Sequence, residues 1–149
     1  MVLNKTNIRK IEWHLYKYND FKKYIYNMRE NIIYTSNNVY GESTSKPNTH
    51  SDPTALKAMK LLEVSEEEQW VNIINKVRKK LREENLNLEK FLVKKYFKNY
   101  TMIQIMMELN IERTTAYRWR EEIILNVAIL AIQEGLIKIW INLNRYVIT

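Results

Sequence analysis

The side chains best suited to chemistry form a dense run of hydrogen-bond donors in the last third of the chain. Arginine can donate two parallel hydrogen bonds to guanine, and threonine can bond a base or contact the methyl group of thymine. Such side chains read DNA when they lie near the N-terminal end of a helix in the major groove. We therefore predict that the following residues contact bases: Arg113, Thr114, Thr115, Tyr117 and Arg118.

Positioning these donors requires a second helix that crosses the first one closely. Thr101 is expected to cap that helix, and Asn110 fills the turn position where left-handed backbone is needed. Residues 101–123 therefore predict a helix-turn-helix, with a recognition helix over 112–131. Glu112 is a weaker N-cap than Ser or Thr. The inward-facing residues are expected to be Met102, Ile105, Met106, Leu109, Ile111, Ala116, Trp119 and Ile123.

The net charge favours an anionic partner, but most of it lies outside the predicted helix-turn-helix. The formal charge is +7 and the pI about 9.5, which favours nucleic acid. Acidic and basic residues balance over 99–149, so earlier basic segments must supply much of the attraction for phosphates. The residues expected to contact phosphates are Thr101, Lys76, Lys79, Lys80, Arg82 and Arg120.

An alternative interpretation of residues 101–123 is an ordinary helical hairpin whose Arg and Thr side chains are solvated.

Several classes of function lack the residues that they need. The chain has no Cys, and His14 and His50 have no second ligand at metal-binding spacing, so we expect no metal site. No nucleophile motif and no glycine-rich phosphate loop occur, so we expect neither an enzyme nor a cofactor. No segment reads as a signal peptide or a membrane span, so we expect a cytoplasmic protein without a membrane partner.

The scarcity of Gly and Pro, together with helical periodicity, predicts an all-α fold. Residues 1–33 read as an N-terminal helical arm, either one long helix or two shorter ones. A linker or loop rich in Ser, Thr and Asn follows over 34–54. Residues 55–134 are expected to form a helical bundle that ends in the helix-turn-helix and binds DNA. Residues 135–149 form an apolar tail whose pattern fits a helix or a strand equally well.

Local motifs divide the predicted DNA-binding domain further. A short helix is expected over 55–62, and a capping box beginning at Ser65 predicts the start of the next helix. Another helix is expected over 88–99, leading directly into Thr101. Gly135 is expected to end the last helix.

Three stretches of the chain carry a resemblance to a known family. They are Ser51-Asp52-Pro53-Thr54 with Ala55, Ala58 and Leu61-Leu62, the segment FLVKKYFKNY over 91–100, and the unit over 101–123. In their order and spacing they resemble the RinA/ArpU family of phage-encoded transcriptional regulators, which are similar to sigma factors in the domain that reads the minus-35 promoter element. The resemblance spans roughly residues 5–134. It implies a phage or prophage protein that activates late genes at the bacterial nucleoid, and it assigns base contacts to the same residues between 113 and 118.

These observations leave more than one hypothesis for the function. The leading one is a sequence-specific transcriptional activator that binds double-stranded promoter DNA and recruits host RNA polymerase. A sigma-like factor that binds core RNA polymerase is one alternative, and a DNA-packaging protein like a small terminase subunit is another. In a further alternative, the apolar tail and the aromatic N-terminal arm form a protein-interaction module. Either segment could also form a homo-oligomer.

Overall fold

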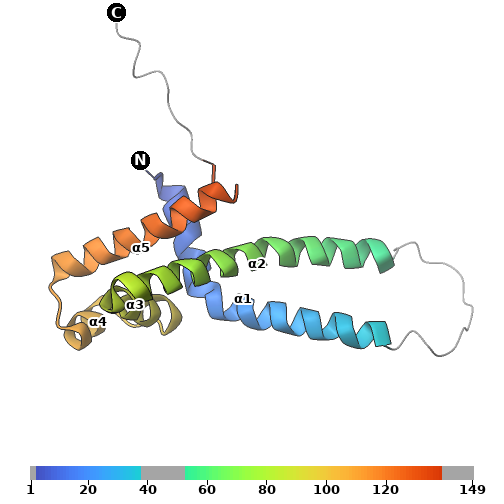
Figure 1. Ribbon diagram of the computed structural model, residues 1–149, viewed down its shortest axis with the longest axis horizontal. Helices are drawn as coiled ribbons and strands as arrows, with labels where there is room; N and C mark the ends of the chain where they lie inside the picture. The colour runs from blue at the N-terminus through green and yellow to red at the C-terminus, as the bar shows by residue number, and fades with distance from the viewer. Residues whose placement is uncertain (1–2, 38–52, 139–149) are drawn as a thin grey trace, which may run out of the picture.

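The computed structural model describes residues 3–37 and 53–138, and within them the side chains of residues 3–31 and 65–138. All regular secondary structure in these ranges is helical, so the predicted all-α fold is confirmed. In chain order the elements are α1 (Lys5–Asn37), α2 (Pro53–Glu84), α3 (Leu86–Leu92), the π-helical turn η1 (Val93–Phe97), α4 (Met102–Leu109) and α5 (Arg113–Gln133) (Figure 1).

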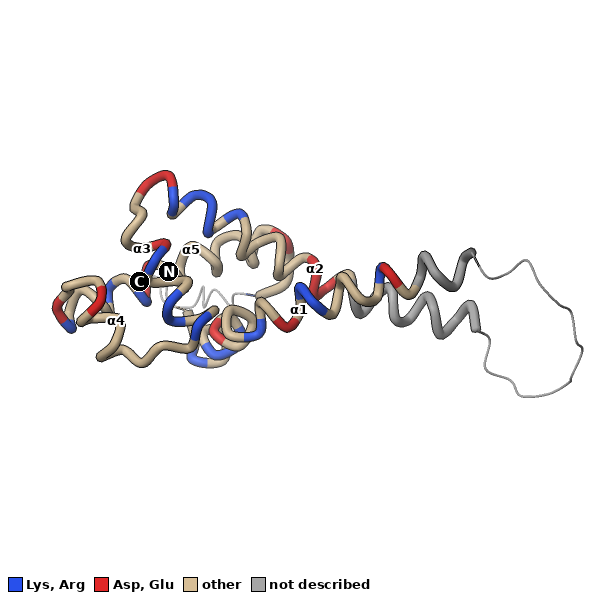
Figure 2. Tube along the Cα trace, turned by 90° about the horizontal axis from the view of Figure 1, so that it is seen from below, with Lys and Arg blue, Asp and Glu red and all other residues tan. Residues whose placement is uncertain are grey.

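The two long helices α1 and α2 lie side by side and extend together away from the other helices (Figures 1 and 2). α1 is a single helix, which decides between the two predicted possibilities. α2 continues through Ser65, so the predicted start of a new helix there is wrong. Ser and Glu are tolerated in the interior of a helix, and no Gly or Pro occurs between Thr54 and Glu84 to end it.

The predicted linker over 34–54 falls mostly on residues 38–52, which lie outside the described residues. At its edges the structure differs from the prediction, because α1 continues to Asn37 and α2 begins at Pro53. Most of the predicted apolar tail, residues 139–149, also lies outside the described residues. Before it, Gly135 follows α5 with φ of +75°, which confirms the predicted end of that helix.

The hydrophobic core joins the predicted N-terminal arm to the helices that follow it. Ile11 and Leu15 of α1 are fully buried, in one cluster with Trp70 of α2 and Ile123 of α5. Burying an aliphatic or aromatic side chain of this size contributes roughly 1.5–3 kcal/mol. The α1 segment is therefore packed as part of the core that supports α5.

One titratable group lies inside the interface between α1 and α2. The His14 ring is only 3% exposed and stacks on the Trp70 ring at a centroid distance of 4.0 Å. Burial and the nearby charge of Lys10 lower the pKa of His14 to about 4, so the imidazole is neutral at physiological pH. The Glu67 carboxylate lies 3.6 Å from its Nδ1 atom.

The connection from α2 to α4 is built by a cap and a wide helical turn. The Asn85 side chain starts α3 by accepting hydrogen bonds from the backbone N–H groups of Asn87 (3.1 Å) and Leu88 (3.2 Å). The helix predicted over 88–99 therefore begins earlier than expected. It also ends earlier, because it passes into η1 and Asn99 adopts left-handed backbone with φ of +56°. η1 buries Tyr96 completely.

No helix within residues 3–37 and 53–138 combines the length and the apolarity that a membrane span requires.

Candidate nucleic-acid interface

Capping interactions define the unit formed by α4, the turn and α5. At the start of α4, the Thr101 Oγ1 atom accepts a hydrogen bond from the Gln104 backbone N–H (3.3 Å), and the Gln104 Oε1 atom accepts one from the Thr101 backbone N–H (2.9 Å). The cap at Thr101 is thus confirmed as a full capping box, which the sequence Thr-x-x-Gln could have indicated. The Thr101 hydroxyl, which we expected to contact phosphate, also donates to Gln104 Oε1 at 2.9 Å. Both its donor and its acceptor are therefore used by the cap.

The turn between the two helices has the predicted backbone geometry. Asn110 is left-handed, with φ of 50° and ψ of 53°, and lets the chain leave α4 abruptly. The Ile111 backbone N–H then donates to the Met106 carbonyl at 3.1 Å. Glu112 precedes α5 without a side-chain cap, as its residue type suggested. The short capped turn and the helices on either side of it form a helix-turn-helix arrangement.

The inward face of this unit is packed as predicted. Ile105, Ala116 and Ile123 are fully buried. Trp119 is half-buried and meets the Phe91 ring edge-on at 6.0 Å, which gives it a structural role in the core. The other predicted inward residues are partly buried and pack against the same core; they are Met102, Met106, Leu109 and Ile111.

The outward face of the first turns of α5 carries the predicted base-contacting side chains. Arg113, Thr114, Tyr117 and Arg118 are exposed, and Thr115 is half-buried. The Arg113 guanidinium lies 5.6 Å from the centroid of the Tyr117 ring, a cation–π contact that leaves its N–H donors accessible. Within the described part of the chain, neither Arg113 nor Arg118 forms an ion pair. Both guanidiniums are therefore available to a ligand.

Arg120, which we expected to contact phosphate, differs from these residues because it is paired within the protein. Its Nε and Nη2 atoms donate to the two carboxylate oxygens of Glu12 in α1, at 2.7 and 2.6 Å. The hydrogen bonds that Arg120 donates to the Glu12 carboxylate raise the pKa of Arg120 further, so the charge is permanent. Arg120 faces α1 because it lies on the same side of α5 as the core residues. Its predicted phosphate contact is thus replaced by an internal salt bridge.

Glu12 has a second donor, which the sequence reasoning did not single out. The buried Tyr96 hydroxyl donates to Glu12 Oε1 at 3.0 Å. Burial and the neighbouring Glu12 carboxylate raise the pKa of Tyr96, so its hydroxyl stays protonated and continues to donate. Glu12 therefore joins α1 to η1 and to α5, the helix that carries the candidate base contacts.

The predicted phosphate-contacting residues of α2 share one broad outward arc, but they are not equally free. Since successive residues of an α-helix are rotated by about 100°, Lys79 lies in the middle of this arc, and the residues at its two edges contact different segments. Lys76 pairs with Glu134 at 3.3 Å, and Lys80 donates to Asn126 at 3.0 Å, so both face α5. Arg82 faces α3 instead. Lys79 is exposed and forms no ion pair with any described residue.

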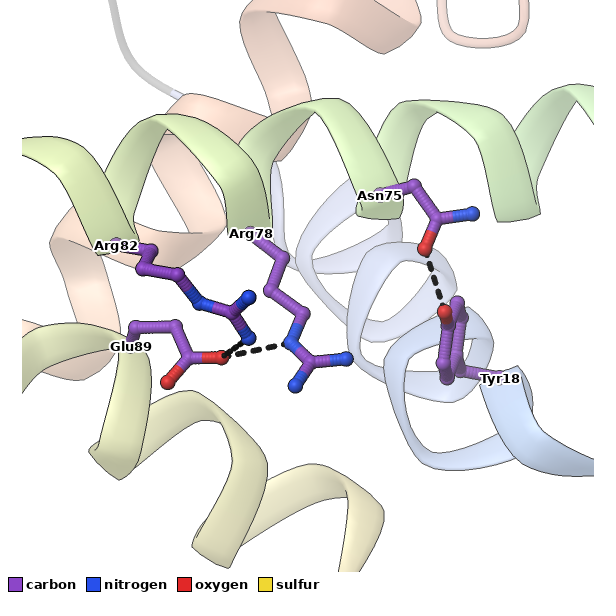
Figure 3. A network of polar contacts seen from close by, with 5 residues as sticks. All are labelled: Tyr18, Asn75, Arg78, Arg82 and Glu89. Atoms are coloured by element: carbon purple, nitrogen blue, oxygen red, sulfur yellow. Dashed lines mark hydrogen bonds and ion pairs between the residues drawn. The ribbon is translucent and has the colours of Figure 1, made fainter. Parts of the chain in front are cut away.

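The α3 side of α2 holds a network that the sequence reasoning missed (Figure 3). Glu89 Oε1 accepts hydrogen bonds from Arg78 Nε at 2.7 Å and Arg82 Nη2 at 3.0 Å. Burial alone would raise the pKa of the Glu89 carboxyl, but the hydrogen bonds and charges of Arg78 and Arg82 outweigh burial and lower it. A hollow of about 180 Å³ lies beside this network, lined by Asn75, Arg78, Lys79 and Arg82.

The described residues also include a second hollow, but no cluster of side chains suited to a metal ion. Among the side chains of residues 3–31 and 65–138, no three from His, Cys, Asp or Glu converge in a way that could hold a metal ion. An open hollow of about 260 Å³ lies between α1 and α2 and is lined mainly by apolar surface; Ile25, Tyr26 and Val71 contribute to it. Lys and Arg residues are distributed over several helices rather than gathered on α5 (Figure 2).

Comparison of the chain with known protein families, with characterised proteins and with solved structures finds no match. The resemblance to the RinA/ArpU regulators therefore rests on the residues and spacing of this sequence.

Proposed function

We propose that this protein binds double-stranded DNA sequence-specifically, with the first turns of α5 in the major groove. The observation that carries the proposal is the combination of a capped helix-turn-helix with unpaired, exposed donors at the start of its second helix. Arg113 and Arg118 have no ion-pair partner in the described residues. In other helix-turn-helix proteins the N-terminal residues of the second helix contact base edges in the major groove. The exposed arginine, threonine and tyrosine side chains of α5 lie at this end of the helix.

The packing around α5 supports the same proposal. Base reading requires a helix whose orientation is fixed, because a bidentate contact tolerates little displacement. Glu12 holds Arg120 through two short hydrogen bonds, and Trp119 is wedged against Phe91. α5 is thus anchored on its inner side while its outer side is left open.

The proposal extends, through the family resemblance, to activation of phage late genes by recruitment of host RNA polymerase. The residues that support this extension are those over 51–62 and 91–123. A reporter carrying the selected binding site upstream of a weak promoter tests it. Transcription should rise when the protein is expressed, whereas binding without activation would limit the function to DNA binding.

Selection of bound duplexes from a random library, followed by fluorescence anisotropy, tests sequence-specific binding. We expect one enriched motif, and we expect Arg118→Ala to bind it roughly tenfold more weakly, about 1.4 kcal/mol, while binding of unrelated duplexes changes little. Lys98→Ala, which removes an exposed cation away from α5, serves as the matched control. If no motif is enriched, or if both variants weaken every duplex equally, the groove assignment is wrong.

A further inference from the structure

The hollow beside α2 has an unusual chemical character for its size. Its lining consists of Asn75, Arg78, Lys79 and Arg82, and no acidic residue lines it. Its volume of about 180 Å³ leaves room for a tetrahedral anion, since a water molecule occupies about 30 Å³ in the liquid. We propose that this hollow is a phosphate-binding site.

Charge is the first argument for a phosphate. Three cations surround the hollow, and among the described residues Glu89 is the single carboxylate that bonds any of them. One carboxylate against three cations leaves two positive charges. A phosphate group carries a matching negative charge and presents oxygens that arginine can bond in pairs.

Unused donors are the second argument. Both arginines approach the same Glu89 oxygen, Arg78 through Nε and Arg82 through Nη2. Each guanidinium therefore keeps most of its N–H groups for another acceptor. The Asn75 Oδ1 atom is occupied by the Tyr18 hydroxyl at 2.5 Å, so the amide N–H groups are what Asn75 can offer a ligand. Every lining residue is thus a donor.

The third argument is that partners behind the hollow fix its arginine and asparagine side chains in advance (Figure 3). The Arg78 guanidinium lies 5.8 Å from the Phe97 ring, and that ring stacks on Tyr18 at 4.3 Å. Tyr18 in turn holds Asn75, and Glu89 holds both arginines. Preorganisation of this kind lowers the entropy that binding must overcome, and a solvated surface has no need of it.

The phosphate can belong to a nucleic-acid backbone or be free in solution, and only the first source rests on the proposed function. The first arm of the test is titration of the full chain with inorganic phosphate at constant ionic strength, observed through the NMR signals of the Asn75 amide and the arginine Nε–H groups. We expect saturable shifts there. Arg78→Gln should weaken the affinity at least tenfold and Lys79→Gln about threefold, whereas Lys90→Gln, an exposed residue on α3, should bind like the parent protein.

The second arm identifies the source with a duplex of random sequence. If the phosphate is a backbone phosphate, Arg78→Gln should reduce the slope of log affinity against log salt concentration by about 0.9. If the slope is unchanged while inorganic phosphate still binds, the site serves a free phosphate. The proposal is overturned if inorganic phosphate gives no saturable shift and the slope is also unchanged.

Two features keep this test independent of folding and of the groove assignment. Lys79 forms no ion pair in the described residues, so Lys79→Gln reports on the hollow even if Arg78→Gln destabilises the fold. The recognition helix is read separately through Arg118→Ala. If the parent protein selects no base sequence, or Arg118→Ala leaves its selectivity unchanged, while inorganic phosphate still binds at the hollow, the proposed function is refuted and this site still stands.

Discussion

The cations of α2 and those at the start of α5 lie in contrasting surroundings. On α2, Arg78 and Arg82 meet the Glu89 carboxylate of α3, and Lys76 meets the carboxylate of Glu134, just after α5. At the start of α5, Arg113 and Arg118 are exposed and form no ion pair within the described residues. We call the cations that are paired with a carboxylate within the fold the held region. Arg113 and Arg118 form the free face, whose charges are available to a partner. Net charge by itself does not reveal this difference.

The difference also assigns different tasks to similar residues. A held cation contributes to the orientation of helices, and a ligand can use only its remaining donors. A free cation contributes little to stability, because exposed charges are screened by water and salt. Substitutions in the held region should therefore change the free energy of unfolding, and those on the free face should change DNA binding.

Acid should have its largest effect at the interface between α1 and α2, through His14. In the unfolded chain His14 takes up a proton near pH 6.5, whereas burial, with the charge of Lys10, lowers its pKa to about 4 in the folded protein. Between these values the unfolded state binds more protons, so the free energy of unfolding falls as the pH falls from 6.5 to 4. We expect the free energy of unfolding, measured by urea denaturation, to fall by about 2–3 kcal/mol over this pH range.

The matched variant for this prediction is His14→Phe, which keeps a ring against Trp70 without a titratable group. Its free energy of unfolding should depend much less on pH in the same window. Parallel curves for the two proteins would show that His14 is not the group responsible.

The next largest effect is expected at Arg120, the cation of α5 that belongs to the held region. Arg120→Ala leaves the half-buried Glu12 carboxylate with only the Tyr96 hydroxyl as partner. We expect a loss of about 2 kcal/mol in the free energy of unfolding, less than for a fully buried pair because both side chains are partly solvated. Thermal and urea denaturation measure this, and Arg120→Ala in a Glu12→Ala background should cost clearly less.

Arg118→Ala should show the opposite behaviour. We expect unfolding to change by less than about 0.5 kcal/mol, while binding to the selected duplex weakens roughly tenfold, about 1.4 kcal/mol. Denaturation and anisotropy on the same sample separate the two readouts. A variant that melts earlier and binds all duplexes less well would place Arg118 in the held region and end the contrast between the two sets.

The smallest effect compares two neighbouring lysines of α2. Lys79 has no described ion-pair partner, whereas Lys80 donates to Asn126 and lies 4.0 Å from Glu84. If DNA passes α2, Lys79→Gln should lower the salt slope by about 0.9, with less than a threefold change in affinity at physiological salt. Lys80→Gln should lower the slope by less. Equal slopes in the two variants would contradict the inference that Lys79 is free while Lys80 is held toward α5.

Features determined by neighbouring residues could be predicted from the sequence. The left-handed Asn110, the cap at Thr101 and the stop at Gly135 depend on interactions within a few positions, and all are present. The inward face of the helix-turn-helix follows from periodicity alone. The continuity of α2 through Ser65 was missed because an internal Ser-x-x-Glu pattern resembles a helix start when nothing else is known.

Contacts between segments that are distant in the sequence could not be predicted from it. Arg120 and Glu12 are separated by 108 positions, and nothing local to either residue indicates the other. Which basic residues of α2 contact α5 and which contact α3 depends on where those helices pack. Periodicity within α2 does not give their positions. The buried Glu89 stood in the sequence as one acid among many. Only the packing of α3 against α2 makes it the centre of a network.

η1 adds a constraint of a different kind, on the number of residues rather than on their types. A π-helical turn accommodates an extra residue relative to an α-helix, and one residue corresponds to a rotation of about 100°. Through η1, Tyr96 reaches Glu12 and Phe97 reaches Tyr18, so two contacts with α1 depend on the register of this turn. Deletion of any one residue between Val93 and Phe97 would remove only one side chain. It would nevertheless turn the Tyr96 and Phe97 rings away from α1. Substitutions at the partly exposed positions 93–95 can therefore be tolerated where changes of length cannot.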